Sequence, residues 1–323
     1  MDLTGRSVLV TGGTGSFGRR FVRRLLDASQ ARRVIVFSRD ELKQWEMQRS
    51  YPGEERLRFF LGDVRDHSRL LRALDGVDVV VHAAALKQII AAEYNPFEAV
   101  LTNIHGAKNV IDAAIERGVE RVVALSTDKA CSPINLYGAT KLVSDKLFVD
   151  GNAYAGGKAT RFSVVRYGNV AGSRGSVVPL FRELAPSGVL PITDERMTRF
   201  WITLDTAVDF VLRRLGDMEG GEVFVPKIPS LHVVDLARAM APEAELSMVG
   251  VRPGEKLHEE LISQHDARRT LDRGDHFVLQ PDMPWWPRRD RSGTPLAEDF
   301  SYTSENNPWW LSVEELARMV EDV

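Results

Sequence analysis

Near its amino terminus the chain reads Ser7-Val8-Leu9-Val10-Thr11-Gly12-Gly13-Thr14-Gly15-Ser16-Phe17-Gly18, and this stretch decides the fold. Its apolar start predicts a short buried strand, and residues 19–26 have the spacing of an amphipathic helix. The four glycines allow a tight turn, close approach of backbone to a pyrophosphate, and close packing of helix on strand. Phosphates would lie at the helix amino terminus, on free N–H groups and the positive end of the helix dipole. The stretch therefore predicts a dinucleotide site.

Strand and helix patterns alternate from residue 5 to about residue 168. Apolar runs predict further strands at residues 33–37, 57–61, 77–81, 121–125 and 160–167. This order is typical of the α/β class, as a Rossmann-type doubly wound parallel sheet with right-handed crossovers. We expect residues 1–168 to form a dinucleotide-binding domain, to which some later segments return. Residues 169–323 are expected to form mainly a smaller, mixed α/β substrate-binding domain.

The end of the second predicted strand bears on the choice of cofactor. It reads Ser38-Arg39-Asp40, and Lys43 follows one turn into the next helix. An acidic residue immediately at this strand end would bind the ribose 2′-hydroxyl of NAD, whereas serine and arginine suit the 2′-phosphate of NADP. Alternatively, Ser38 or Asp40 is a helix N-cap among ordinary surface charges. We predict NADP, bound by Gly12, Thr14, Gly15, Ser16, Phe17, Gly18, Ser38, Arg39, Asp40, Lys43, Asp63, Val64, Ala83, Ala84, Ala85, Lys87, Tyr137 and Lys141.

A second polar stretch, residues 126–141, follows the buried-strand pattern of residues 121–125 and leads into a helical pattern over residues 136–149. It places polar side chains at the carboxyl end of a strand, where open α/β sheets bind ligands. Tyr137 and Lys141 are four residues apart and therefore share one helix face. We expect Lys141 to lower the pKa of Tyr137, which makes Tyr137 a base near neutral pH. An isolated pair of this kind would more often be solvated surface, but the upstream glycine turn favours catalysis.

Composition excludes several classes of function. The 42 basic and 45 acidic residues give a formal net charge of −3, so nucleic acid or an anionic membrane is not an expected partner. Short, charge-interrupted apolar runs predict no transmembrane helix, and the early strand leaves no room for a signal peptide. Cys131 is the single cysteine, which suits the cytoplasm, and we interpret it as a packed residue. His82 has no accompanying ligand cluster, so we expect it to pack as well and predict no metal site.

Beyond residue 168 the pattern is less regular. Cationic or mixed loops occur at residues 172–179, 197–202 and 252–259. Cations there, facing the carboxyl edge of the sheet, would suit a substrate that carries its own pyrophosphate, although scattered surface charge is the alternative. Two tryptophan pairs, Trp285-Trp286 and Trp309-Trp310, are interpreted as packing anchors. Ser312 and Glu315 predict a capping box for a last helix.

These motifs resemble the extended short-chain dehydrogenase/reductase family, and within it the nucleotide-sugar dehydratases that act on UDP-N-acetylglucosamine. The resemblance covers nearly the whole chain and is most specific at Ser126–Lys129 followed by Asn135–Lys141. In that family the pair after the threonine, here Asp128-Lys129, separates dehydratases from epimerases that share the tyrosine and lysine. Tyr137 matches the type that inverts C5, since the retaining relatives carry methionine there together with an extra transmembrane region.

The resemblance implies an NADP-dependent hydro-lyase that makes a 4-keto-6-deoxy sugar and regenerates its cofactor in every cycle. Tyr137 would take the proton of the 4-hydroxyl, and Lys141 would hold the ribose. Thr127 would hydrogen-bond near O4, Lys129, if desolvated, would remove the C5 proton, and Asp128 would protonate the departing 6-hydroxyl. The family also implies a homo-oligomer, for example a hexamer, and a role in deoxysugar biosynthesis.

By position, the resemblance assigns substrate contacts to Lys87, Arg166, Asn169, Arg174, Val177, Arg199, Arg252 and Glu255. One departure follows Lys87, where inverting relatives usually have a polar residue, a small aliphatic residue and proline. This chain has Gln88-Ile89-Ile90. Without the proline we expect a freer loop beside the sugar, which leaves the exact hexose open.

Two other functions remain as alternatives. A nucleotide-sugar 4-epimerase, or a dehydratase of different regiochemistry or substrate, would use the same tyrosine and lysine. The Asp128-Lys129 pair argues against plain epimerisation. A non-catalytic NADP-binding regulator would need no general base, so Thr127, Tyr137 and Lys141 argue against that function.

Overall fold

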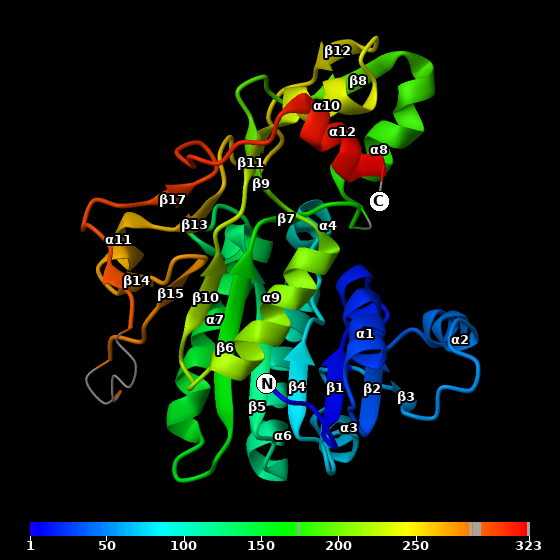
Figure 1. Cartoon of the computed structure of the whole chain (residues 1–323), viewed down its shortest axis with the longest axis vertical. Coiled ribbons are helices and arrows are strands. Elements are labelled where there is room, and N and C mark those ends of the chain that lie inside the picture. The colour runs from blue at the N-terminus through cyan, green and yellow to red at the C-terminus, as the bar shows by residue number, and fades with distance from the viewer. Residues whose placement is uncertain (174, 284–285, 287–291, 322–323) are drawn as a thin grey trace.

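The computed structural model describes residues 1–173, 175–283, 286 and 292–321. Its centre is a ten-stranded sheet in the order β16-β14-β15-β10-β6-β5-β4-β1-β2-β3 (Figure 1). The run from β10 to β3 is parallel, and β15, β14 and β16 extend it antiparallel. The strands are β1 (Ser7–Thr11), β2 (Arg33–Ser38), β3 (Leu57–Leu61), β4 (Val79–His82), β5 (Arg121–Thr127), β6 (Arg161–Tyr167), β10 (Val223–Pro226), β14 (Thr270–Asp272), β15 (His276–Leu279) and β16 (Thr294–Pro295).

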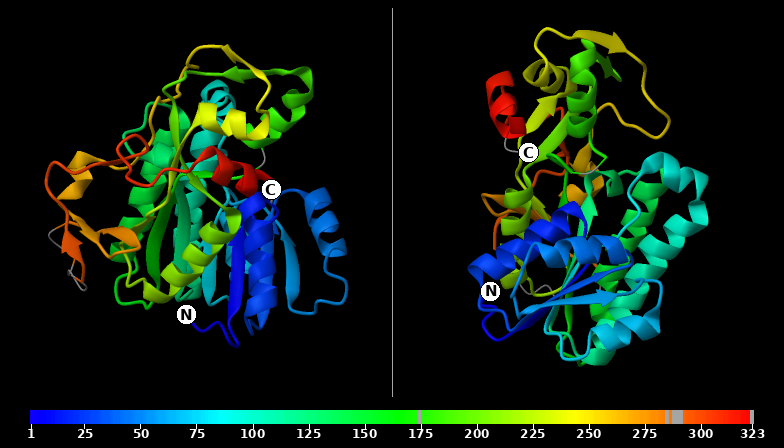
Figure 2. Two further views of the ribbon diagram at one scale, coloured as in Figure 1. Left: turned by 45° about the horizontal axis from the view of Figure 1, so that its top comes forward. Right: turned by 90° about the vertical axis from the view of Figure 1, so that its right-hand side faces the viewer.

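Helices cover both faces of this sheet. One face carries α1 and α9, and the other carries α3, α6 and α7 (Figure 2). The helices of this part are α1 (Ser16–Ala28), α2 (Glu41–Arg49), α3 (His67–Ala73), α4 (Ile89–Tyr94), α5 (Pro96–Val100), α6 (Gly106–Arg117), α7 (Leu136–Tyr154) and α9 (Leu204–Asp217). Single turns η1 (Leu101–His105, a π-helix) and η2 (Asp128–Ala130, 3₁₀) join them. The doubly wound α/β fold expected from the sequence is confirmed.

A smaller lobe lies over the carboxyl ends of the parallel strands (Figure 1). Two of its small sheets and several helices pack around a second apolar core, and a third small sheet packs against the main core. Its elements are β7 (Asn169–Val170), α8 (Val177–Leu184), η3 (Ala185–Ser187), β8 (Val189–Ile192), β9 (Thr198–Ile202), β11 (Ser230–His232), α10 (Val233–Met240), β12 (Glu245–Met248), β13 (Glu260–Ile262), α11 (Gln264–Ala267), β17 (Tyr302–Thr303) and α12 (Val313–Glu321).

Local sequence explains where the site-bearing elements begin. All five residues of β1 are buried, as expected for a parallel strand covered on both faces. Asn135 caps α7 by accepting a hydrogen bond from the Gly138 N–H at 2.8 Å. At the far end of the chain, Ser312 and Glu315 form the predicted capping box of α12. These caps fix the helix starts independently of distant packing.

Between the fourth and fifth strands, helical residues 96–117 form three consecutive pieces, α5, η1 and α6. Segments beyond residue 168 return to the main sheet, since α9 packs on α1 and β10 extends the parallel run beside β6. The main sheet therefore includes residues from both sides of the predicted boundary.

Candidate active site

A cavity of about 1090 Å³ lies along the carboxyl ends of the parallel strands and is bordered on its other side by the smaller lobe. Its lining includes the glycine turn after β1, the ends of β2 and β4, the β5–α7 connection, and the loops before and after β9. The two polar stretches that the sequence singles out, residues 11–18 and 126–141, therefore meet in one space. This is the position where open α/β sheets bind ligands.

The glycine turn has the shape that a pyrophosphate requires. Gly12 has a φ of +65°, and a Cβ there would lie 2.9 Å from the Ala84 backbone. A Cβ on Gly18 would lie 2.5 Å from Gly13 Cα, so side chains are excluded where α1 packs on the turn. Gly15 caps α1 without a side-chain hydrogen bond, which leaves the amino-terminal N–H groups directed to the cavity. The residues present thus fit a nicotinamide dinucleotide.

The end of β2 combines the two alternatives of the sequence analysis, a helix N-cap and a cation that faces the cavity. Asp40 is the N-cap of α2 and accepts a hydrogen bond from the Lys43 N–H at 3.0 Å. Arg39 nevertheless lines the cavity, about half exposed, with its guanidinium 3.5 Å from the Asp63 carboxylate. Ser38 is buried, and its hydroxyl accepts a hydrogen bond from Gln44 at 3.0 Å. Of the predicted cofactor residues, Asp63 is the one that the cavity lining does not include.

Tyr137 and Lys141 lie on one face of α7, and both line the cavity, as predicted. Their electrostatics differ from the prediction. The Lys141 amine donates a 2.7 Å hydrogen bond to the Leu125 carbonyl, and burial lowers its pKa. Burial raises the pKa of Tyr137 to about 12, opposed by the charge of Lys129 and a hydrogen bond with Thr127. In this state the charge of Lys129 is the largest effect that favours the phenolate, and the effect expected of Lys141 stays a prediction.

The Asp128-Lys129 pair sits in the η2 turn and includes a third charged group, Glu259, from the smaller lobe. Lys129 Nζ lies 3.0 Å from Asp128 Oδ1 and 3.0 Å from Glu259 Oε1. Arg199 Nε is 3.9 Å from the same Glu259 oxygen. Both carboxylates are buried, whereas the Lys129 side chain keeps 21 % of its exposure. We refer to Asp128, Lys129 and Glu259 as the charged triad.

The triad shifts the protonation of its members. Burial raises the pKa of Asp128, and the Glu259 charge raises it further, against the effect of Lys129. Burial alone would lower the pKa of Lys129, but the charges of Asp128 and Glu259 together raise it. Burial alone therefore does not yield a neutral Lys129 in this state, and its role as base stays a prediction. The pKa of Glu259 is lowered, because Lys129 and Arg199 outweigh the cost of burial.

Four carboxylate or amide side chains of the cavity wall each carry a buried oxygen with no hydrogen-bond partner among the described residues. These oxygens are Asp128 Oδ2, Asn169 Oδ1, Glu255 Oε2 and Glu259 Oε2. Leaving such acceptors unpaired costs about 1–3 kcal/mol each. A ligand rich in hydroxyl and amide donors, such as an amino sugar, would satisfy them.

Most of the expected substrate residues share this cavity. Lys87, Asn169, Val177, Arg199, Arg252 and Glu255 all line it. Arg174 lies outside the described residues. Arg166 lies outside the lining and is buried instead in an ion pair with Asp145 at 3.2 Å.

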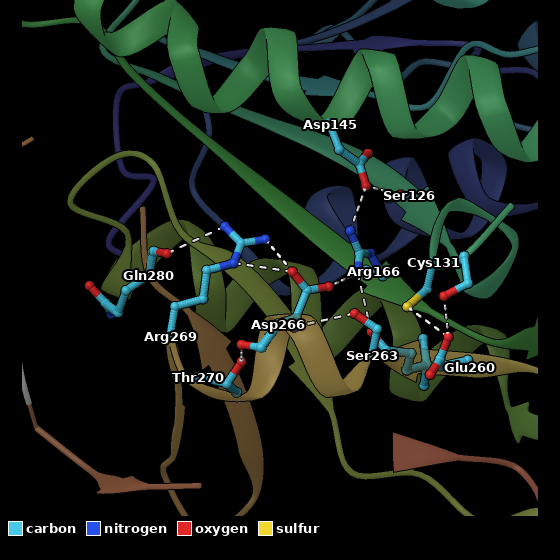
Figure 3. Close-up of polar contacts among 12 residues, drawn as sticks. Ser126, Cys131, Asp145, Arg166, Glu260, Ser263, Asp266, Arg269, Thr270 and Gln280 are labelled. Carbon is cyan, nitrogen blue, oxygen red and sulfur yellow. Dashed lines mark hydrogen bonds and ion pairs between the residues drawn. The ribbon is translucent and has the colours of Figure 1, made fainter. Parts of the chain in front are cut away.

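Figure 3 shows the network around Arg166. The Asp145 carboxylate on α7 accepts hydrogen bonds from Ser126, on β5, and from Arg166, on β6. Arg166 also donates to the Leu261 carbonyl on β13 and lies 3.9 Å from the Asp266 carboxylate of α11. The side chain therefore connects the catalytic helix to the smaller lobe. This role is positional, one layer behind the cavity.

Gln88-Ile89-Ile90 border the cavity, but not as a relaxed loop. Gln88 is the N-cap of α4, and Ile90 lies in the first turn of that helix. A proline is tolerated in a first turn because its missing N–H has no helical partner there. The backbone at this position therefore does not require the proline of the relatives.

Glu259 is a candidate functional residue that the sequence did not indicate. It is the last residue of the charged loop 252–259, but nothing in its local pattern distinguishes it. Its contact with Lys129 spans 130 positions of the chain and depends on the smaller lobe. Only its place in a charged segment assigned to the substrate could have suggested it.

The two residues expected to pack do so. His82 is buried with its Nδ1 2.8 Å from the Thr11 hydroxyl, and burial lowers its pKa to about 3. Cys131 is buried next to Glu260.

Trp310 stacks on His232 with ring centroids 4.5 Å apart, while Trp285 falls outside the described residues. Within the described ranges no helix is long and apolar enough to cross a membrane, and no cluster of His, Cys, Asp and Glu could hold a metal ion.

Comparisons with known proteins agree with this geometry. A protein-family model described as "Polysaccharide biosynthesis protein" matches residues 8–281. The chain is 50 % identical to a UDP-N-acetylglucosamine 4,6-dehydratase (inverting) of Campylobacter jejuni, over 98 % of this chain and 97 % of the relative. The crystal structure of Pen from Bacillus thuringiensis superposes with a TM-score of 0.91 at 34 % identity, covering 100 % of this chain and 98 % of that one.

A second solved structure has a nicotinamide cofactor bound. It is DesIV, a dTDP-glucose 4,6-dehydratase from Streptomyces venezuelae, described with NAD and TYD bound. Its TM-score is 0.70 at 27 % identity, over 78 % of this chain and 86 % of that one. The glycine turn, the tyrosine–lysine helix and these similarities lead to one assignment: the chain belongs to the polysaccharide biosynthesis protein family, among the extended short-chain dehydrogenase/reductases.

Proposed function

We propose that the chain dehydrates UDP-N-acetylglucosamine to a UDP-linked 4-keto-6-deoxy sugar with inversion at C5. One observation carries the proposal: an acid–base pair, buried Asp128 and partly exposed Lys129, lies beside Tyr137 in a cavity that also contains a dinucleotide-type glycine turn. Near full-length similarity to an inverting dehydratase supports the same activity.

Each catalytic side chain has a distinct task in this reaction. The glycine turn and Lys141 would hold a nicotinamide cofactor, which would supply a hydride acceptor for C4 and a hydride donor for C6. Tyr137 removes the proton of the 4-hydroxyl, with Thr127 hydrogen-bonded beside it. The C4 ketone makes the C5 proton acidic. Lys129 takes that proton, the C5–H electrons form the C5=C6 bond, and the C6–O bond breaks as Asp128 protonates the oxygen to give water.

The contact between Lys129 and Asp128 supplies both groups in the required protonation state. At 3.0 Å, a proton can pass from the ammonium to the carboxylate. One transfer gives a neutral amine and a protonated acid together, without exchange with solvent. After elimination the amine is protonated and the acid is ionised, so the same transfer resets the pair. A proton delivered to the opposite face of C5 then gives the inverted product.

Substrate recognition is proposed for the cavity residues of the smaller lobe. Arg199 and Arg252, with Lys87, supply cations for the pyrophosphate of a nucleotide sugar. Asn169 and Glu255 offer unpaired oxygens to sugar or base donors. Val177 provides an apolar contact.

NADP is the cofactor that we propose over NAD. Arg39 and Lys43 at the end of β2 are the cations that would face a 2′-phosphate. A charge-assisted hydrogen bond contributes about 1.5–3 kcal/mol, so Arg39→Ala should weaken NADP binding about 10- to 100-fold and leave NAD binding nearly unchanged. Equilibrium titration of both cofactors checks this, and an equal loss for both would favour NAD.

Mass spectrometry of the product separates this function from the alternative. A dehydratase product lacks one water relative to UDP-N-acetylglucosamine, whereas a 4-epimerase product has the same mass as its substrate. We expect loss of water with the natural protein and no loss with Asp128→Asn. An isomer of unchanged mass would establish epimerisation.

A homo-oligomer, for example a hexamer, and a cytoplasmic location in a deoxysugar pathway complete the proposal, and light scattering tests the oligomer.

A further inference from the structure

We infer that Glu259 is a positioning residue of the acid–base pair, which holds the Lys129 ammonium so that Asp128 is free to carry a proton. The inference deepens the proposed dehydratase function and rests on it for its kinetic test. Glu259 belongs to the smaller lobe, immediately before β13, and reaches the η2 turn from the far side of the cavity.

The contacts of Glu259 hold its carboxylate beside the Lys129 ammonium. Glu259 is buried, and its Oε1 lies 3.0 Å from Lys129 Nζ. Its backbone N–H donates to the Ser304 hydroxyl at 2.9 Å, which fixes the position of the residue. Its second oxygen, Oε2, has no hydrogen-bond partner in the part of the chain that the structure describes. Two carboxylates thus share one ammonium.

Sharing the ammonium has a direct consequence for the acid. If Asp128 were the single counter-ion of Lys129, it would have to remain ionised to balance a buried positive charge. Glu259 shares the ammonium, and its charge favours a proton on Asp128 as well as on Lys129, so the proton that leaves Lys129 can be held by Asp128. The same contact retains Lys129 in place after Asp128 has given up its proton to the leaving hydroxyl.

Other charged or titratable groups face the triad from neighbouring elements. They are Arg199 on β9, Lys256 in the preceding loop and Tyr137 on α7. Arg199 and Lys256 are cations, so they favour ionised Glu259 and do not replace it as counter-ion. Glu260, the next residue, accepts hydrogen bonds from Ser132 and from Cys131 instead; Figure 3 shows the contact with Cys131.

The negative charge of Glu259 determines the direction in which its removal moves the pH–rate profile. Glu259 raises the pKa of both Asp128 and Lys129. Removing its charge lowers both, so the whole pH–rate profile should move to lower pH, whichever member acts as acid or base. Glu259→Gln should also lower kcat about 100-fold, because a positioned acid or base contributes that much. KM should stay within about threefold, since the triad is not a phosphate contact.

Two controls separate this role from a structural one. Glu259→Asp retains the charge one methylene further away, so its profile should lie between those of the natural protein and Glu259→Gln. Glu260→Gln removes the same charge one residue away and should keep the pH midpoints of the natural protein. Thermal unfolding shows whether each variant is folded, and Glu259→Asp carries the test if Glu259→Gln is not. Midpoints left unmoved in the charge-free variant, or moved equally by Glu260→Gln, would overturn the inference.

A second readout needs no substrate and therefore stands if the proposed function fails. Lys129 is partly exposed in the cavity, so its amine can react with dinitrofluorobenzene. Labelling at pH 9, measured by peptide mass spectrometry, follows the neutral amine fraction. A pKa lowered by one unit gives about tenfold more of it. We expect about tenfold faster labelling of Lys129 in Glu259→Gln than in Glu260→Gln, and equal rates would refute the role of Glu259.

Discussion

At the residue scale, burial shifts the pKa values of the site residues, and nearby charges oppose these shifts only in part. Burial raises the pKa of Tyr137 to about 12, and Lys129 is the cation that opposes this effect. The sequence suggested Lys141 from helical spacing, which correctly placed it on the same face. Spacing could not show that the Lys141 amine is engaged by the Leu125 carbonyl.

Tyr137→Phe tests the proposed base directly. The change removes one hydroxyl and leaves the glycine turn intact, so cofactor binding should be preserved. Turnover should fall at least 100-fold, in the range of general-base contributions. Product formation is measured beside a cofactor titration. Near-normal turnover would show that another group removes the 4-hydroxyl proton.

Cys131 is predicted to be inert. Burial raises the pKa of its thiol to about 12. Since only the thiolate is nucleophilic, roughly 10⁻⁴ of the thiol is reactive at pH 8. Iodoacetamide should label Cys131 in denaturant and not in the folded protein, as read by mass spectrometry. Rapid labelling of folded protein at pH 7 would contradict the packed assignment.

At the element scale, the Arg166 network fastens α7 to β5, β6 and the smaller lobe (Figure 3). Sequence similarity placed Arg166 at the sugar, because a cation at a strand end resembles a substrate contact. The structure turns the side chain away from the cavity toward Asp145. Which way a strand-end side chain points depends on the lobe that covers it, and that lobe is not encoded locally.

Arg166→Met should therefore destabilise the fold rather than remove a substrate contact. Breaking a buried ion pair by deleting one partner costs about 3–5 kcal/mol. Arg196→Met is a matched control, because Arg196 is 68 % exposed beside Asp194 and its loss should cost below about 1 kcal/mol. Denaturant unfolding measures both free energies. A stable Arg166→Met protein with a raised KM would restore the substrate role.

At the scale of the whole molecule, the two lobes differ in how far sequence predicts them. Strands β1 to β6 are mostly apolar runs between turn signals, and their predicted positions agree within a few residues. The smaller lobe is built from strands of two to five residues. Its pairings are distant, as between β13 and β17. Such strands carry too little periodicity to predict.

The same difference holds for the candidate site. Its glycine turn is a local strand–turn–helix motif, and the residues predicted there line the cavity. Glu259 reaches Lys129 only after the chain has folded back over the sheet, so no local motif could indicate it. The cavity between the lobes is where the predictable and unpredictable parts of the site meet.

The most direct test of the proposed function is incubation of the purified protein with UDP-N-acetylglucosamine in deuterated water, followed by NMR of the product. We predict a 4-keto-6-deoxy sugar with deuterium at C5 and inverted configuration. Deuterium at C5 with retained configuration would contradict the inversion. A 4-epimer that retains its 6-hydroxyl would contradict the dehydratase function and the role given to Asp128 and Lys129.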